Sequence, residues 1–118
     1  MKEIQIIIRP NLYYKTKAAL TENRFYAMST KEVLGRGKRG VHFSSVDDKD
    51  AKDDVYANSF VAKKMIDMIV PDYDVDQIVK IVLDVNSHSK EGDGKIFIMP
   101  VEEVIRIHTK ESGEDALL

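Results

Sequence analysis

The sequence predicts an α+β domain of the ferredoxin-like, split βαβ class, with a long loop between its second and third strands. Two observations support this class. Strand-like and helix-like segments follow one another as strand, helix, strand, strand, helix, strand (βαββαβ), which is the split βαβ order. The chain has 118 residues, which suits one domain with one core, so residues 1–118 are expected to form a single domain.

The first strand and the first helix are expected on either side of Pro10. Residues 3–9 (EIQIIIR) are rich in β-branched side chains, and Pro10 cannot donate a ladder hydrogen bond, so the strand should end there. Residues 12–23 place apolar side chains at roughly helical spacing, with Asn11 as a candidate N-cap.

The second strand should finish near Gly35, because Thr30 and Val33 favour extended structure and glycines follow at 35, 37 and 40. Residues 41–60 are rich in Asp and Lys and have few apolar side chains at their centre, which predicts a long exposed loop. With its base, this loop covers about 36–60. A structureless loop of that length inside a compact domain is uncommon and is usually functional.

The second half of the chain repeats the pattern strand, helix, strand. Residues 61–70 have strand character and are closed by Pro71, and residues 72–88 predict a helix with an acidic first turn. Residues 94–100 (GKIFIMP) form the last clear strand, and residues 104–109 (VIRIHT) are a candidate extension of the sheet. In this class both helices cover one sheet face, so the other face is left bare, which favours oligomerisation.

Composition excludes several classes of protein. The net charge of −2 gives no support for a nucleic-acid partner. The absence of cysteine excludes disulfides, thiolate metal sites and a cysteine nucleophile. No apolar run approaches the roughly 20 residues that a membrane-spanning helix needs, so we expect no membrane insertion and a cytoplasmic location.

The first candidate anion site is the glycine-rich segment GRGKRG (35–40). Its glycines would let a phosphate approach the backbone, and Arg36, Lys38 and Arg39 would supply cations. It is neither a Walker A loop nor a dinucleotide-binding fingerprint. A solvated basic turn explains the segment about as well as a polyphosphate site does.

The second candidate is EGDGKIF (91–97), which places Asp93 between two glycines and Lys95 directly after them. This pattern suits either an anion site or an ordinary glycine turn into a strand. Basic residues at the neighbouring strand ends usually direct their charged groups to solvent. The split βαβ fold nevertheless brings the ends of strands two and three and the turn before strand four towards one edge. The basic residues in question are Lys63, Lys64 and Arg106.

Catalytic and metal sites have little support. The three histidines, His42, His88 and His108, fall in different elements without the spacing of metal ligands. No arrangement of Ser, His and Asp or of paired carboxylates points to catalysis. Tyr56 lies in the long loop and is expected to be an exposed contact residue rather than a site of modification.

Several segments resemble, in order and spacing, the PII signal-transduction (GlnB-like) proteins. They are MKEIQIIIRP, AMSTKEVLGRGKRG, IVP, GDGKIFIMPVEEVIRIHT and ESGEDALL, and together they span nearly the whole chain. The most specific part is GDGKIF followed by VIRI. By this resemblance, residues 36–60 correspond to the T-loop of that family, 88–95 to its B-loop and 106–118 to its C-terminal segment.

The resemblance implies a regulator rather than an enzyme. PII proteins are trimers whose bare sheet faces line the interior. They bind ATP or ADP, with Mg²⁺, in three clefts between subunits, and 2-oxoglutarate beside the Mg-ATP. Their T-loop changes shape with the ligand and docks on target proteins.

The resemblance also implies roles for residues at matching positions. Those matching nucleotide-binding positions are Ala27, Met28, Ser29, Gly35, Arg36, Gly37, Lys38, Arg39, Ile69, Gly92, Asp93, Gly94, Lys95, Arg106 and His108. For 2-oxoglutarate, Lys63 aligns with the lysine that pairs with a carboxylate, and Gly37 and Arg39 are the other two expected binding residues. Target-binding residues of the T-loop would be Val41, His42, Phe43, Asp47, Asp48 and Tyr56.

Two departures from the family pattern bear on ligand binding. GRGKRG is one residue shorter than the usual stretch, and the glutamine that helps organise Mg²⁺ and 2-oxoglutarate is missing. His108 stands where a second phosphate-binding arginine is expected, which should weaken phosphate contact at neutral pH because histidine is then mostly neutral.

The loop is also longer and more acidic than is usual in the family. Together these departures resemble the nitrogen-fixation (NifI) branch, and the longer loop resembles the larger of its two paralogues. Members of that branch act in pairs to bind and inhibit dinitrogenase, and ATP with 2-oxoglutarate releases the block. The alternatives are a general PII protein acting on glutamine synthetase or an ammonium channel, a weak ATPase using the same cleft, and a trimeric metal-tolerance protein of the same fold.

Overall fold

A computed structural model describes residues 1–36 and 60–118 of the chain. The predictions that concern the remaining segment therefore lie outside the described residues. They are those made for Gly37, Lys38, Arg39, Val41, His42, Phe43, Asp47, Asp48 and Tyr56.

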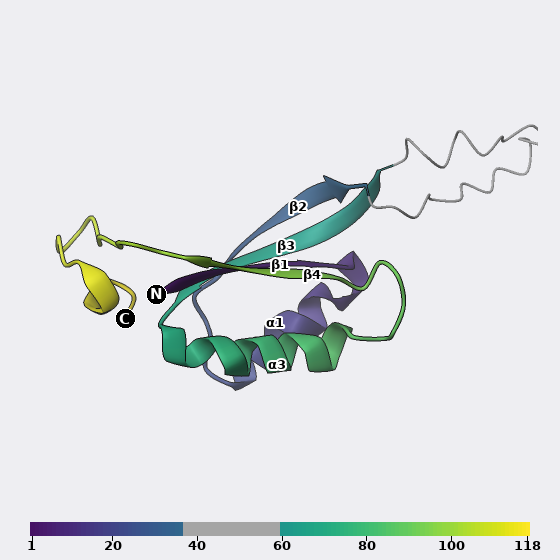
Figure 1. Cartoon of the computed structure of the whole chain (residues 1–118), viewed down its shortest axis with the longest axis horizontal. Helices are drawn as coiled ribbons and strands as arrows, with labels where there is room; N and C mark the ends of the chain where they lie inside the picture. The colour runs from purple at the N-terminus through teal and green to yellow at the C-terminus, as the bar shows by residue number, and fades with distance from the viewer. Residues whose placement is uncertain (37–59) are drawn as a thin grey trace, which may run out of the picture.

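The predicted fold class is confirmed: four antiparallel strands form one sheet, and two helices pack on it (Figure 1). The strands lie in the order β2-β3-β1-β4, so β1 is central and β4 is an edge strand. The elements are β1 (Lys2–Ile8), α1 (Tyr13–Glu22), β2 (Ser29–Gly35), β3 (Val61–Val70), α3 (Val75–Asn86) and β4 (Gly94–Pro100).

Both helices lie on the same side of the sheet in Figure 1. Alternate residues of the two central strands point towards them and are buried, as expected for strands with one covered face. The core consists of Ile4, Ile6, Ile8, Tyr13, Leu20, Ile66, Met68, Val70, Ile78 and Val82. Burial of a side chain of this size stabilises the fold by roughly 1.5 to 3 kcal/mol, so the covered face supplies much of the stability.

The helices begin differently from the sequence prediction. Pro10–Leu12 form a short 3-10 helix, and the α-helix follows only at Tyr13. The prediction that Asn11 caps the helix is wrong, because Asn11 lies inside this 3-10 turn and neither helix start has a side-chain cap. Proline at the first position of a turn lacks only a hydrogen bond that would be unmade there, which favours the turn at Pro10.

The prediction that residues 104–109 extend the sheet is also wrong. Strand β4 pairs with β1 from Gly94 opposite Ile8 to Pro100 opposite Lys2, and the Val101 amide then donates to the Met1 carbonyl. The β1–β4 ladder ends there. The chain beyond β4 folds back on itself instead, with an isolated bridge between Ile105 and Ser112.

Neither α1 nor α3 covers the opposite face of the sheet. It carries the other alternate residues of the strands, and Phe97 on it is 43% exposed. Its apolar members are Ile7, Met65, Ile69, Phe97 and Met99. Among residues 1–36 and 60–118 there is no helix with the length and apolar character needed to cross a bilayer.

Candidate functional site

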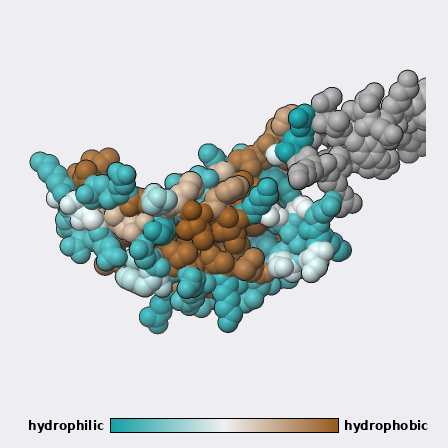
Figure 2. Space-filling model, viewed as in Figure 1, coloured by the Kyte–Doolittle hydropathy of each residue, from teal (hydrophilic) through white to brown (hydrophobic). Residues whose placement is uncertain are grey.

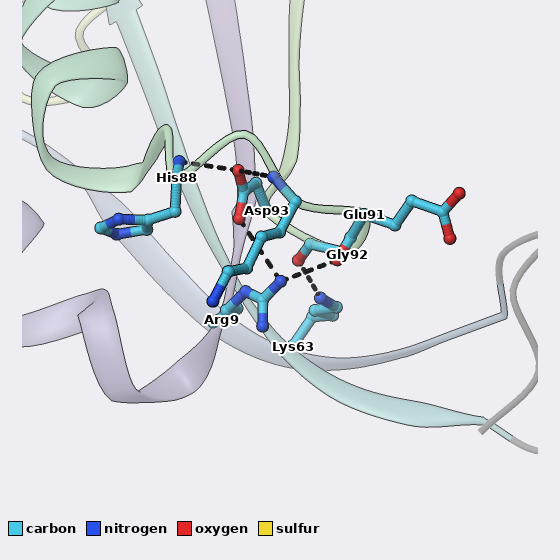
Figure 3. Close-up of polar contacts among 7 residues, drawn as sticks. Arg9, Lys63, His88, Glu91, Gly92 and Asp93 are labelled. Atoms are coloured by element: carbon cyan, nitrogen blue, oxygen red, sulfur yellow. Dashed lines mark hydrogen bonds and ion pairs between the residues drawn. The ribbon is translucent and has the colours of Figure 1, made fainter. Parts of the chain in front are cut away.

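Three segments that are distant in the sequence meet where β1 ends, β3 begins and the loop before β4 closes (Figure 3). The Lys63 ammonium on β3 donates a hydrogen bond of 2.7 Å to the carbonyl oxygen of Gly92. Lys63 also lies beside the end of β2, because it pairs with Val33 and its Cγ would be 3.8 Å from a Cβ at Gly35. Through Lys63, the loop 88–93 is therefore connected to the end of β2, which directly precedes the segment predicted to be the T-loop.

Arg9 is the second cation of this site, and the sequence prediction did not include it. Its Nη2 donates to the carbonyl oxygen of Glu91 at 2.8 Å and to Oδ1 of Asp93 at 3.4 Å. In the sequence, the feature that could have pointed to Arg9 is its position between Ile8, which is buried, and Pro10, at the point where the chain leaves the sheet. Position alone gave no acceptor for it, since Glu91 is 82 residues away in the sequence.

Asp93 folds the loop around its carboxylate. Its Oδ2 accepts hydrogen bonds from the backbone amides of His88 at 2.8 Å and Lys90 at 3.2 Å, while Oδ1 faces Arg9. The hydrogen bond from the His88 amide holds the pKa of Asp93 below its usual value. The hydrogen bond from the Lys90 amide and the charge of Arg9 act in the same direction. Asp93 therefore organises the loop, and its carboxylate is already occupied by donors.

We expect the loop conformation to depend on pH through Asp93. Because its pKa is lowered in the folded chain, the stabilisation is complete above the ordinary aspartate value of about 3.9 and is lost as pH falls through the lower folded value. In an NMR titration, the amide resonances of His88 and Lys90 should move together with a midpoint below about 3.9. The Asp93→Asn variant should show no such step, and a wild-type midpoint at or above the ordinary value would contradict the assignment.

The two glycines of the loop are required by space as well as by conformation. Gly92 has φ +88°, and a Cβ there would lie 3.2 Å from Nη2 of Arg9. Gly94 has φ +120°, and a Cβ there would lie 1.9 Å from the backbone oxygen of Ile7. The motif GDG is thus explained by close approach to β1 on one side and to the Arg9 side chain on the other.

The site has a surplus of positive charge. Lys95 pairs in register with Ile7, so its side chain lies on the uncovered face, to which the alternation of β1 also directs Arg9. Burial and the neighbouring Arg9 lower the pKa of Lys63, which favours capture of an anion there. Arg9 and Lys63 beside the two glycines, with Lys95 directly after Gly94, form an arrangement suited to an anionic ligand such as a phosphate or a carboxylate.

A second group of predicted residues lies towards the other end of the sheet. Ser29 pairs with Asp67, and Ile69 pairs with Glu3, whereas Gly94 pairs with Ile8 at the opposite end of β1. A hollow of about 160 Å³ is lined there by Ser29, Thr30, Lys31, Met65 and Asp67. Burial and the nearby Glu3 carboxylate raise the pKa of Asp67. Ala27 and Met28 directly precede β2 at this end of the sheet.

Arg106 and His108 lie beyond β4, in the C-terminal segment, and not beside Lys95. The guanidinium of Arg106 donates to Oε2 of Glu111 at 3.0 Å, to the Asp115 carbonyl at 3.1 Å and to the Leu118 carbonyl. Strand β4 separates it from the loop at residues 88–93. Within one chain, the predicted residues therefore form two groups at opposite ends of the sheet.

An apolar groove of about 420 Å³ lies between α3 and the edge strand β4. Figure 2 shows a continuous hydrophobic area over this part of the molecule. Leu83 and Ile98 line the groove and are about half exposed. Across the described parts of the chain, no three His, Asp or Glu side chains come together as a set of metal ligands.

The chain is similar to nitrogen regulatory proteins over nearly its whole length. The family model described as "Nitrogen regulatory protein P-II" matches residues 1–111. The chain is 40% identical over 122 residues to "Nitrogen fixation nifHD region GlnB-like protein 2" of Methanobacterium ivanovii, and all of both chains is covered. It is 35% identical over 117 residues to "Nitrogen regulatory protein P-II" of Rhodobacter capsulatus, covering 99% of this chain and 100% of the relative.

The similarity extends to a solved structure. The crystal structure of Arabidopsis thaliana PII bound to citrate matches with a TM-score of 0.74 and 25% sequence identity. The match covers 98% of this chain and 88% of the Arabidopsis chain.

Proposed function

Because the chain belongs to the nitrogen regulatory P-II family, we propose that it is an allosteric regulator that binds ATP or ADP and senses 2-oxoglutarate. Its long loop, 36–60, would dock on dinitrogenase and inhibit it when 2-oxoglutarate is low. The observation that carries the proposal is the cluster of Arg9, Lys63 and Lys95 around the glycine loop, beside the base of the long loop.

The division of the predicted residues into two groups supports a nucleotide site shared between subunits. The loop end supplies backbone amides and cations for the phosphates, namely Gly92, Gly94 and Lys95. The other end supplies the segment around Ser29 and Ile69 for the adenine, and also Arg106, which would reach the phosphates from the neighbouring subunit. A second copy of the chain would bring the two ends together, and covering the apolar sheet face would stabilise such an assembly. We therefore propose a trimer, either of this chain alone or mixed with a paralogue.

The proposed carboxylate ligand is supported by Lys63. Its ammonium is partly buried beside Arg9, and a dicarboxylate would neutralise the surplus positive charge there. The similar Arabidopsis protein is described as bound to citrate, which is also a polycarboxylate. In this proposal Lys63 exchanges the Gly92 carbonyl for a carboxylate oxygen of 2-oxoglutarate.

Mg²⁺ would enter with the nucleotide. In the described part of the chain the nearby carboxylate, Asp93, already accepts three hydrogen bonds and belongs to no cluster of metal ligands. The ion would therefore be held mainly by the phosphates, where it neutralises their charge. The role of this chain is to hold the phosphates with Lys95 and the loop amides.

The nitrogenase partner is supported by the relatives. The similar proteins of Methanobacterium ivanovii and Methanococcus maripaludis are both named for the nifHD region of nitrogen fixation, at 40% identity. The Rhodobacter relative carries only the general family name, so a regulator of glutamine synthetase or an ammonium channel is the second candidate. Both candidates use the same nucleotide site and differ in the protein that the long loop contacts.

Two measurements test the proposed function. Isothermal titration calorimetry should detect ATP binding to the purified protein, and absence of binding would refute the proposal.

A pull-down should retain dinitrogenase without effectors and release it on addition of ATP with 2-oxoglutarate. Retention that ignores both ligands would refute the switch, while capture of glutamine synthetase instead of dinitrogenase would favour the second candidate. Steady-state phosphate release that is lost in Lys95→Ala would indicate a weak ATPase.

A further inference from the structure

We propose that Arg9 is a positioning residue for the phosphate-binding loop, acting through Asp93 rather than on the nucleotide. The inference deepens the proposed function and rests on it for the identity of the ligand. The hydrogen bonds from Arg9 to the Glu91 carbonyl and the Asp93 carboxylate join the end of β1 to the loop 88–93. We call these two contacts the tether.

The backbone holds Arg9 in a fixed direction. It follows Ile8, which is 2% exposed, and precedes Pro10, whose ring restricts the preceding residue to extended conformations. Arg9 has φ −64° and ψ 138°, in agreement with that restriction. A side chain that leaves such a constrained position reaches the loop with little loss of backbone freedom.

The contacts of Arg9 show what it does for the loop. One nitrogen, Nη2, joins the Glu91 carbonyl to the Asp93 carboxylate, so it holds two points of the loop at once. The other carboxylate oxygen of Asp93 holds the amides of His88 and Lys90. Arg9 and Asp93 together thus fix both sides of the turn (Figure 3).

The contacts and burial of Arg9 argue against a direct contact between its guanidinium and a phosphate. Its Nη2 is already paired within the loop, and its Nε is buried without a hydrogen-bond partner in the described structure. Gly92 packs under the guanidinium, where a Cβ would lie 3.2 Å from Nη2 and would require the Arg9 side chain to shift. A phosphate would meet the amides of the loop and Lys95, whereas Arg9 holds the loop from β1.

The tether has a consequence for ligand exchange. Lys63 also holds the loop, through the Gly92 carbonyl, and it is the residue proposed to move to a carboxylate ligand. When Lys63 leaves, the Arg9–Asp93 pair still joins the loop to the sheet. The phosphate site would then stay assembled while the carboxylate is bound.

A double-mutant cycle with ATP tests the inference. The variants are Arg9→Gln, Asp93→Asn and the double variant, with Lys17→Gln on the exposed side of α1 as a control for the lost charge. Each single variant should weaken ATP binding about tenfold, and the double variant should bind about as weakly as either single one, because both remove the same pair. If the two losses multiply, Arg9 acts separately from Asp93, as a direct phosphate ligand would, and the inference is overturned.

Hydrogen exchange of the ligand-free protein separates this inference from the proposed function. Amides 88–94 should lose protection in Arg9→Gln, while those of β1 and β3 keep theirs, which also shows that the variant folds. Unchanged protection of 88–94 would overturn the tether. If wild type fails to bind ATP but the exchange result is as expected, the proposed function fails and the tether stands.

Discussion

Replacing Gly94 with alanine is expected to lower the free energy of unfolding by about 3 kcal/mol, because the substitution combines backbone strain with overpacking. Gly94 has φ +120°, a conformation that alanine rarely adopts, and the new Cβ would lie 1.9 Å from the Ile7 oxygen. That oxygen belongs to β1, which is held between β3 and β4 in the sheet. The start of β4 would have to separate from β1, and the loop that precedes it would move with it.

Gly113→Ala is the matched control. Gly113 also has a positive φ, +74°, but nothing lies within 4 Å of a Cβ there. Its substitution should lower the free energy of unfolding by only about 1 to 2 kcal/mol, from the left-handed conformation alone. Urea denaturation followed by circular dichroism measures both. Equal losses for the two variants would show that the contact with Ile7 contributes nothing.

Much of the fold was predictable because its elements carry strong local signals. The β-branched run before Pro10 and the apolar segment closed by Pro71 became two adjacent central strands. The first ends two residues before its proline and the second ends one residue before. The periodic apolar residues of 72–88 became α3, although the helix itself starts at Val75. The prediction for residues 104–109 failed because strand formation there depends on a partner strand that is distant in the sequence. Residues 104–109 have strand composition, but the β1–β4 ladder stops at the pair of Lys2 and Pro100 and does not reach them.

The site was less accessible to prediction, because it depends on contacts between distant segments. The glycine loop and Lys63 were singled out from the sequence, and the family resemblance gave them roles. The hydrogen bond that joins them is nevertheless set by the register of β3 on β1 and β2. Arg9 was missed because its acceptors belong to a loop that follows another strand. The sequence placed Asp93 in a turn. The structure gives the physical reason for that turn, because the Asp93 carboxylate accepts hydrogen bonds from two amides of the same loop.

The second large effect is expected from Lys63→Met. If Lys63 pairs with a carboxylate of 2-oxoglutarate, the variant loses a charge-assisted hydrogen bond, and the effect of 2-oxoglutarate on ATP affinity should fall about ten- to hundredfold. Binding of ATP alone should weaken less, because the Arg9–Asp93 pair still holds the loop after the Gly92 carbonyl loses its donor. Calorimetric titration of ATP, with and without saturating 2-oxoglutarate, measures both quantities.

Lys64→Met provides a control of the same chemistry one residue away. Lys64 points to the helix-covered side, where its ammonium lies 5.0 Å from the centre of the Tyr13 ring and 3.5 Å from a carboxylate oxygen of Glu32. Its removal should leave the response to 2-oxoglutarate unchanged, since strand alternation keeps it away from the loop. If the two variants lose the response equally, the general positive charge of β3 attracts the ligand, and Lys63 has no specific part in its recognition.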